Sequence, residues 1–486
     1  MFPLVYEINT RIWLLKLSRK YNRTITLGNI PEEEFTFFSS CCFDLVWLMG
    51  VWQPSQYSKA IATAHQGLRS SFLEHTALVQ PADIAASPYS IPSYTVNEAL
   101  GGEQELILFR QKLNACGIKL MLDFVPNHLA LDNEWLPEHP EFFIPVSSEE
   151  QSQDPESGFE YTRGKYLAYG KDPYFAPWTD TLQLNYAEKG THKMMTENLF
   201  RISALCDAVR CDVAMLILKS VFNTTWSNLG GPMQEEFWPR AIASVKHRHP
   251  GFLFLAESYW NKEWELQQQG FDFTYDKPFY DYLSSAPVNV EKLTGHMMAQ
   301  WEYQKHLCRF IENHDEPRAA ENIGLNNKAA ALVLLTAPGM HLVHQDQMEG
   351  YRLKIPVQLL KQAPEPEDGE LEKLYKTLFR LQKSQLFQNG QIEKLDLNGV
   401  SNSHCFGFHR FTEDEHAYVL ANFNATGIAI EFYHPSLDLV AVDTLELLTT
   451  ASDNKNDDIE FTENAIQVSL APHEGIVITF RKRAVK

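Results

Sequence analysis

Carboxylic acids stand at or near the ends of four short apolar stretches of this 486-residue chain. They are Asp123, Asp212, Glu257 and Asp315. Two acids held close together suit nucleophilic and acid–base chemistry, because one can be ionised while its neighbour keeps a proton. Cleavage of a glycosidic bond with retention of configuration uses such a pair, with the carboxyls about 5 to 5.5 Å apart.

Other polar residues accompany these acids in the sequence, namely Asn127, His128, Arg210 and His314. An Arg beside a nucleophilic carboxylate keeps it ionised, and a third carboxylate can hold substrate hydroxyls. Each acid taken alone has a simpler explanation, as a helix N-cap or as the partner of a nearby Arg. Four acids at one rim are harder to explain in this way, because burying so much like charge is costly unless the site uses it.

Eight apolar stretches of strand length alternate with segments of helical spacing. The predicted strands are 4–9, 43–50, 118–124, 207–213, 251–257, 271–276, 308–315 and 340–345. This order is typical of an α/β protein with a closed (β/α)8 TIM barrel. The carboxyl ends of the strands meet at one rim of such a barrel, so we expect the four acids to lie together there.

Two long segments interrupt this pattern, at residues 51–92 and 129–186. The second is rich in Pro, Gly, Ser, Asp and Tyr, and it predicts a loop-rich inserted domain over the barrel mouth after the third strand. After residue 386, alternating β-branched and aromatic residues predict an all-β sandwich. We therefore divide the chain into a catalytic barrel of residues 1–128 and 187–385, an inserted subdomain of residues 129–186 and a C-terminal β-sandwich domain of residues 386–486.

The composition argues against several classes of protein. A formal net charge of −20 opposes binding to nucleic acid or to an anionic membrane. Seven Cys residues form no C-x-x-C pair, so no zinc site or disulfide framework is indicated, and free thiols favour a reducing compartment. The N-terminal residues lack a signal-peptide pattern, and no run of about 18 apolar residues predicts a membrane span. We expect a cytoplasmic protein, although signal-independent export would leave no trace, and the oligomeric state stays open.

Four segments resemble, in order and rough spacing, the signature segments of the alpha-amylase family of glycoside hydrolases. They read MLDFVPNH (121–128), AVRCDVAML (208–216), LFLAESYW (253–260) and FIENHDEPR (310–318). Two further segments are similar to motifs in the family's inserted domain and in the loop after its second strand, namely WTDTLQLNY (178–186) and YSIPSY (89–94). The resemblance spans most of residues 1–385 and implies a retaining glycosidase built on a (β/α)8 barrel.

The resemblance implies a role for each of three acids. Asp212 is the nucleophile, Glu257 is the general acid/base, and Asp315 stabilises the transition state by gripping sugar hydroxyls. The implied reaction is hydrolysis or transfer at an α-glucosidic bond of an α-glucan, a maltooligosaccharide or a short α-glucoside, through a covalent glycosyl-aspartate. The partner is a carbohydrate substrate, and the chemistry requires no cofactor.

Five further residues match ligand-binding positions of the family. The resemblance implies that Arg210 holds the nucleophile ionised, and that His128 and His314 hydrogen-bond the sugar in the cleaved subsite. Tyr89 stacks on the face of that sugar or only packs in its loop. Asn127 helps to bind a structural calcium ion or only holds the loop after the third strand by local hydrogen bonds.

Several positions depart from the family pattern. Starch-cleaving members commonly carry Lys and His three and four residues after the nucleophile, where this chain has Met215 and Leu216. Ser93 stands where an Asp is customary, and Asp-Gln-Met at 346–348 replaces a Gly-x-Glu near the eighth strand. We therefore predict a preference for short substrates or for glycosyl transfer over cleavage inside long starch chains.

Two other functions fit parts of the pattern. A catalytically inactive relative that binds or scaffolds carbohydrate would keep the barrel, but it predicts damage among the three acids, and all three are present. A metal-dependent barrel hydrolase would use Asp123, His128, His314 and Asp315. It lacks the His-x-His motif or bridging Lys expected near the strand ends of such a site.

Overall fold

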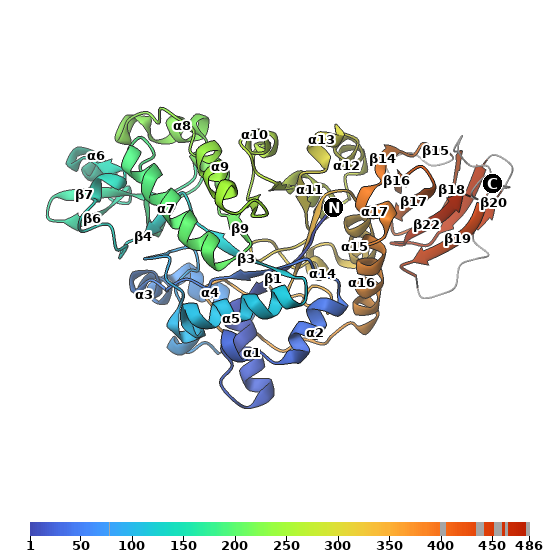
Figure 1. Cartoon of the computed structure of the whole chain (residues 1–486), viewed down its shortest axis with the longest axis horizontal. Coiled ribbons are helices and arrows are strands. Elements are labelled where there is room, and N and C mark those ends of the chain that lie inside the picture. Colours follow the sequence, from blue (N-terminus) through green and yellow to red (C-terminus); the bar gives the residue numbers. More distant parts are fainter. Residues whose placement is uncertain (77, 399–404, 434–441, 452–458, 462–464, 483–486) are drawn as a thin grey trace.

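The computed structural model describes the chain except for residues 77, 399–404, 434–441, 452–458, 462–464 and 483–486. Three parts follow one another along the long axis of the molecule in Figure 1. A small insertion with its own sheet lies at one end, a barrel with surrounding helices lies in the middle, and an all-β part lies at the other end. No helix in the described part of the chain is long and apolar enough to cross a membrane.

Eight parallel strands close into a barrel in chain order, with the last strand paired to the first. They are β1 (Leu4–Asn9), β2 (Leu45–Met49), β3 (Lys119–Phe124), β9 (Ala208–Cys211), β10 (Leu253–Ala256), β11 (Phe273–Tyr275), β12 (Leu307–Arg309) and β13 (Met340–His344). Each strand overlaps one of the eight predicted stretches, so the predicted (β/α)8 fold is confirmed. The seventh strand is shorter than predicted, because β12 ends at Arg309 and the chain then turns.

Side chains on the barrel strands alternate between two cores. On β1, Leu4, Tyr6 and Ile8 belong to the large core that includes the surrounding helices. Val5 joins the second core inside the barrel, together with Trp47 of β2. Both faces of the strands are therefore buried, which explains why the strands read as continuous apolar runs.

Helices follow the strands and wrap the barrel (Figure 1). Those before β9 are α1 (Thr10–Tyr21), α2 (Glu32–Ser40), α3 (Gln56–Ala64), α4 (Gln66–His75), α5 (Gly102–Ala115) and α7 (Lys189–Leu205). Those after β9 are α8 (Lys219–Gly230), α9 (Trp238–Arg248), α10 (Glu263–Gln268), α11 (Lys277–Ser284), α12 (Val290–Met297), α13 (Trp301–Gln304), α14 (Ala319–Asn322), α15 (Asn327–Thr336), α16 (Gly369–Gln382) and α17 (Gln385–Asn389). Helices α3 and α4 lie within the predicted insertion after the second strand.

The insertion after β3 contains more regular structure than its loop-like composition indicates. Its elements are β4 (His128–Ala130), β5 (Pro145–Val146), α6 (Ser148–Gln153), β6 (Gly158–Thr162), β7 (Lys165–Gly170) and β8 (Trp178–Gln183). The strands form one sheet in the order β4-β8-β7-β5, and β6 pairs with β7. Gly164, with a φ of +74°, permits the tight turn between β6 and β7.

The C-terminal part is a β-sandwich of two sheets. One has the order β14-β16-β17-β22-β19 and the other β15-β18-β21-β20. Their bounds are β14 (Gln391–Lys394), β15 (Leu397–Asn398), β16 (Cys405–Phe411), β17 (Glu415–Asn422), β18 (Ile428–Tyr433), β19 (Val442–Thr449), β20 (Ile459–Phe461), β21 (Ala465–Leu470) and β22 (Gly475–Lys482). Tyr418 and Phe432 from the two sheets meet in its core. The sandwich packs on α15, where Arg410 Nη1 donates to the Thr336 carbonyl at 2.7 Å.

Candidate active site

One buried guanidinium lies among three of the acids that the sequence singles out. Arg210, the third residue of β9, has no solvent exposure. Its Nη1 lies 2.5 Å from Asp212 Oδ1, and its Nη2 lies 2.8 Å from Glu257 Oε2. The same Nη2 lies 3.9 Å from Asp315 Oδ2. The structure therefore places Arg210, Asp212, Glu257 and Asp315 in one cluster at the carboxyl ends of β9, β10 and β12.

The register of β9 and β10 fixes the first two acids. The two strands are parallel neighbours, with Cys211 beside Ala256. The next residue on each strand is an acid, so Asp212 and Glu257 leave the sheet side by side. The chain then turns sharply at Val213, whose φ is +37°. This turn points the Val213 N–H at Glu257 Oε2, at a distance of 2.5 Å.

Donors surround the Glu257 carboxyl, which is only 3% exposed. Besides the Val213 N–H and Arg210, the hydroxyl of Tyr259 donates to Oε1 at 2.8 Å. Tyr259 lies two residues after the acid that it contacts, and it was not among the predicted site residues. These contacts fix the position of both Glu257 oxygens.

The Asp212 carboxyl holds its proton more tightly than an isolated carboxyl does. Burial raises the pKa of Asp212 to about 8, and Glu257 and Asp315 add to the shift against the opposing charge of Arg210. Acids that interact this closely titrate as a unit. The Arg210 charge works against this shift, because it favours the ionised carboxylate that a nucleophile needs.

Asp315 stands in a turn that its neighbour Asn313 stabilises. The Oδ1 atom of Asn313 accepts from the backbone N–H groups of Asp315 and Glu316, both at 2.9 Å. These side-chain bonds replace sheet pairing, and they explain why β12 ends before the polar residues. The Asp315 side chain is 44% exposed, and its Oδ2 lies 2.9 Å from His314 Nε2. Partial burial by itself raises the pKa of Asp315, but the neighbouring His314 lowers that pKa below its usual range.

Tyr89 and His128 complete the predicted sugar-binding set. The Tyr89 ring stacks on the His314 ring, with centroids 5.3 Å apart, and its hydroxyl lies 2.8 Å from His314 Nε2. His128 begins β4 and lies beside the Trp178 ring at 4.9 Å. Burial lowers the pKa of His128 to about 3, so its neutral ring offers one donor and one acceptor. Tyr89 therefore contacts His314, which in turn contacts Asp315 of the cluster. His128 lies at the start of the inserted sheet.

The remaining acid, Asp123, is engaged in the barrel wall. Its Oδ1 accepts from Trp47 Nε1 at 3.1 Å, and its Oδ2 accepts from the Gly50 N–H at 3.2 Å. Burial raises the pKa of Asp123 to about 6. No group of three His, Cys, Asp or Glu residues suited to a metal ion occurs in the described part of the chain. The donor set around Asp123 therefore suits support of the barrel better than metal-dependent hydrolysis.

Asn127 forms a reciprocal amide pair with Gln183 of β8. Asn127 Nδ2 donates to Gln183 Oε1 at 3.2 Å, and Gln183 Nε2 donates to Asn127 Oδ1 at 3.1 Å. The amide oxygen that a calcium ion would need already accepts a hydrogen bond, and no carboxylate among the described residues is bonded to either amide. The side chains at Asn127 do not fit a calcium ion, because hard cations take several oxygen ligands. The amide pair itself links β4 to β8.

The amide pair predicts that calcium chelation leaves the protein stable. A melting temperature within about 1 °C of the untreated value is expected after EDTA treatment, measured by scanning calorimetry, because no metal binding free energy is lost. The variant Gln183→Ala is the matched disruption. It should lower the melting temperature by several degrees, since Asn127 is left buried without its partner. A calcium-reversible drop in the untreated protein would contradict this assignment.

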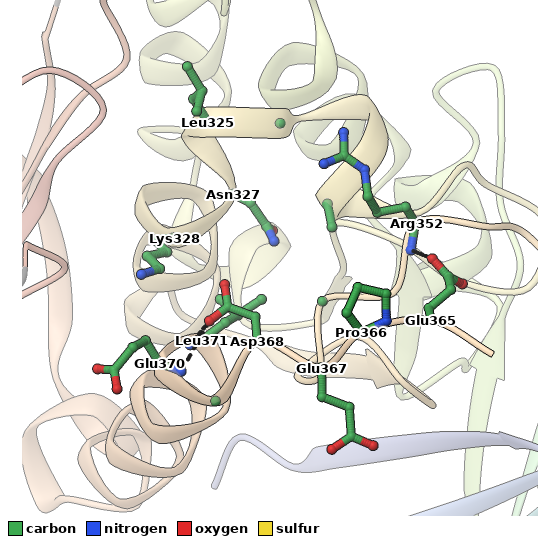
Figure 2. A pocket seen from close by; sticks show the side chains of 14 residues that line it. Leu325, Asn327, Lys328, Arg352, Glu365, Pro366, Glu367, Asp368, Glu370 and Leu371 are labelled. Atoms are coloured by element: carbon green, nitrogen blue, oxygen red, sulfur yellow. Dashed lines mark hydrogen bonds between the residues drawn. The ribbon is translucent and has the colours of Figure 1, made fainter.

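A cavity of about 420 Å³ opens beside the cluster and is lined by residues of α4, the loop after β12 and the loop after β13. His314 and Asp315 form one side of it, and Arg352 forms another. Arg352 also lines a separate pocket of about 750 Å³ that Figure 2 shows from close by. The Nε atom of Arg352 donates to Glu321 Oε2 at 2.7 Å. The first cavity reaches the cluster at His314 and Asp315, which makes it the candidate space for a substrate.

Comparison with known proteins gives matches at two levels. Residues 80–363 match the sequence model of the alpha-amylase catalytic domain. A maltogenic alpha-amylase from Thermotoga neapolitana has a TM-score of 0.71 at 17% identity, over 99% of this chain and 98% of that chain. A trehalose-6-phosphate hydrolase from Bacillus licheniformis has a TM-score of 0.69 at 15% identity, over 99% of both chains. A debranching enzyme from Nostoc punctiforme has a TM-score of 0.68 at 14% identity, over 98% of this chain and 97% of that chain.

No curated protein sequence gives a significant match. At these identities the solved structures establish the fold alone. The match to the family model covers more than half of the chain, and its range includes all of Arg210, Asp212, Glu257 and Asp315. Its description as a catalytic domain agrees with the enzyme predicted from the sequence. The chain therefore belongs to the alpha-amylase family of glycoside hydrolases.

Proposed function

We propose that the chain is a retaining enzyme that cleaves an α-glucosidic bond through a covalent glycosyl–Asp212 intermediate. The single observation that carries the proposal is Arg210, which contacts Asp212 with one nitrogen and Glu257 with the other. Two carboxyls that share one guanidinium lie close together, which supports a retaining pair over the wider spacing that leaves room for the water of an inverting enzyme.

The proposed reaction has two steps. In the first, Glu257 gives its proton to the glycosidic oxygen while Asp212 attacks the anomeric carbon, and the leaving sugar departs. In the second, Glu257 takes a proton from water or from a second sugar, whose oxygen attacks the anomeric carbon and releases Asp212. Asp315 stabilises the positive charge that develops on the sugar ring in both transition states. The sugar configuration is inverted twice and so retained.

The proposed sugar-binding residues surround this centre. Tyr89 offers a ring face beside the Arg210 guanidinium, which lies 5.3 Å from the ring centroid. The neutral ring of His128 suits hydrogen bonds with sugar hydroxyls, and His314 holds Asp315 toward the sugar. Ring faces and fixed polar groups together are the usual features of a carbohydrate site.

The leaving-group side of the site favours short substrates or sugar acceptors. Met215 and Leu216, which replace the Lys-His pair of starch-cleaving members, are 1% and 3% exposed and offer no charged donor. Trp260 follows the acid by three residues, and its exposed ring meets that of Tyr174 from the insertion at 5.0 Å. These two rings supply an apolar surface for one or two sugar units.

A substrate panel tests both the reaction and the substrate class. The unmodified enzyme is assayed against α-linked disaccharides, maltooligosaccharides, amylose and an activated α-glucosyl donor, with the first-formed anomer read by NMR. We expect turnover of short substrates with the α-anomer formed first, and at most about a tenth of that efficiency inside amylose, since one lost charged contact is worth about 1.4 kcal/mol. First release of the β-anomer would overturn the mechanism. Binding of carbohydrate without any turnover would favour the inactive alternative.

A further inference from the structure

A buried carboxylate, Glu7, lies directly behind the catalytic cluster. Glu7 shares the inward face of β1 with Val5 and has no solvent exposure. Its Oε1 lies 2.5 Å from His314 Nδ1, across 307 residues of sequence. Among the described residues its second oxygen, Oε2, has no hydrogen-bond partner. Burying a carboxylate is costly, so a carboxylate whose only hydrogen bond is to one histidine is placed there for that histidine.

His314 lies between two carboxylates. Its Nδ1 faces Glu7, and its Nε2 lies 2.9 Å from Asp315 Oδ2. A carboxylate oxygen accepts hydrogen bonds and does not donate them, so these two neighbours favour hydrogen on both ring nitrogens, which makes the ring an imidazolium cation. The Tyr89 hydroxyl also lies 2.8 Å from Nε2 and can accept from the same N–H. Two aromatic rings enclose the cation. The Tyr89 ring stacks on it, and the Trp47 ring meets it at 5.6 Å.

We propose that Glu7 is a positioning residue that keeps His314 doubly protonated and oriented, so that His314 in turn fixes the exposed Asp315 carboxylate against the sugar. The role of Asp315 in this statement rests on the proposed function, whereas the coupling of Glu7 to His314 does not. Of the three acids in the cluster, Asp315 is the most exposed, so its position depends most on the contact with His314. Without the cation, its side chain would be free to rotate into the cavity.

The charges around the pair agree with this assignment. Burial by itself lowers the pKa of His314, but the neighbouring carboxylates of Asp315 and Glu7 raise that pKa to about 10. Burial by itself raises the pKa of Glu7, but His314 and His344 lower that pKa below its usual value. Other titratable or charged groups also surround the Glu7–His314 pair. They are Asp123 of β3, Arg210 of β9, Tyr275 of β11, Cys308 of β12, His344 of β13 and Tyr89 of the loop after β2. Among them only Asp123 is another carboxylate, and its own hydrogen bonds go to Trp47 and Gly50.

The variant Glu7→Gln tests the proposal, because it keeps the shape and the acceptor oxygen and removes only the charge. The titration of the His314 ring is followed by NMR in the intact chain with labelled histidine, and a His314→Asn spectrum assigns the signal. We expect the pKa of His314 to fall by about one to three units. We also expect kcat to fall about ten- to a hundredfold with little change in KM, because the clamp acts on transition-state charge.

The sign of the pH effect follows from the raised pKa. The stabilisation that charged His314 provides is complete below the unfolded value of about 6.5, and it is lost as the pH rises toward the folded value. In Glu7→Gln this loss, and the fall in activity on the alkaline side, should begin at lower pH. Glu7→Asp keeps the charge and should restore most of the His314 titration.

The matched control is Asp276→Asn, the same chemical change at another buried carboxylate–histidine pair. Asp276 has no exposure and lies 2.6 Å from His296, outside the contacts of His314. It should lower the melting temperature without moving the His314 titration or the alkaline limb of activity. An unchanged His314 titration in folded Glu7→Gln would overturn the inference whatever the kinetics. An active Asp212→Ala would instead overturn the proposed function and leave the Glu7–His314 coupling intact.

Discussion

Replacement of Asp212 with Ala is expected to lower kcat at least about ten-thousandfold, since removal of an enzymatic nucleophile costs this much or more. Asp212 is 6% exposed, and its Oδ1 is fixed at 2.5 Å from Arg210. A carboxylate held in this way loses little entropy on attack, and no neighbouring group takes its place. Glu257 is held by Tyr259 and the Val213 N–H on the other side of the guanidinium. The measurement is kcat on an activated α-glucosyl donor, which does not depend on acid catalysis.

Two further variants separate a lost nucleophile from a damaged fold. Asp212→Asn keeps the size of the side chain and should be as inactive as the Ala variant, with a normal melting temperature. Asp272→Asn removes an aspartate from the opposite rim of the same barrel, where its Oδ1 pairs with Lys246 at 2.7 Å. Such a partly exposed pair contributes about 0 to 1 kcal/mol, so this variant should retain full activity. Turnover above about 1% in folded Asp212→Ala would exclude the covalent mechanism.

The barrel and the three clustered acids were predictable because their signals are local. Each parallel strand is buried on both faces, so β10 appears in the sequence as an unbroken apolar run that closes on Glu257. The carboxyl ends of parallel strands share one rim, which brings Asp212 and Glu257 together once the fold is known. The short spacing of Arg210 and Asp212 is also local, since residues two apart on a strand face the same way.

The rest of the site depends on contacts that no local pattern carries. Glu7 was missed because it meets His314 only when β1 closes the barrel, although an acid inside the apolar run of β1 was the available signal. Trp47 likewise reads as ordinary core, yet it donates to Asp123 and packs on His314. Strand β12 was predicted too long, because the side-chain bonds of Asn313 compete with sheet pairing in a way that composition does not reveal.

Replacement of Glu257 with Gln is expected to separate substrates by their leaving groups. A disaccharide needs a proton on its departing oxygen, so its kcat/KM should fall about a hundred- to ten-thousandfold. An activated donor with a good leaving group needs no such proton in the first step and should lose less there. Its turnover should then be limited by the second step, which lacks the general base. The measurement is the ratio of the two losses, and equal losses would contradict the assignment of Glu257 as the acid.

Azide provides the complementary test in Glu257→Ala. The truncated side chain leaves space beside Arg210, and a small anion in that space attacks the glycosyl–Asp212 intermediate without needing a base. Azide should therefore speed turnover of the activated donor and yield an α-glucosyl azide, since two inversions preserve the configuration. Glu263→Gln is the matched control, because Glu263 is another buried glutamate, 2% exposed, and burial raises its pKa to about 7. Glu263→Gln should keep its activity, and azide should not change its turnover, because the Glu263 carboxyl has no contact with Arg210 or Asp212. A β-configured azide product would show direct displacement at the sugar, and it would remove Asp212 from the reaction path.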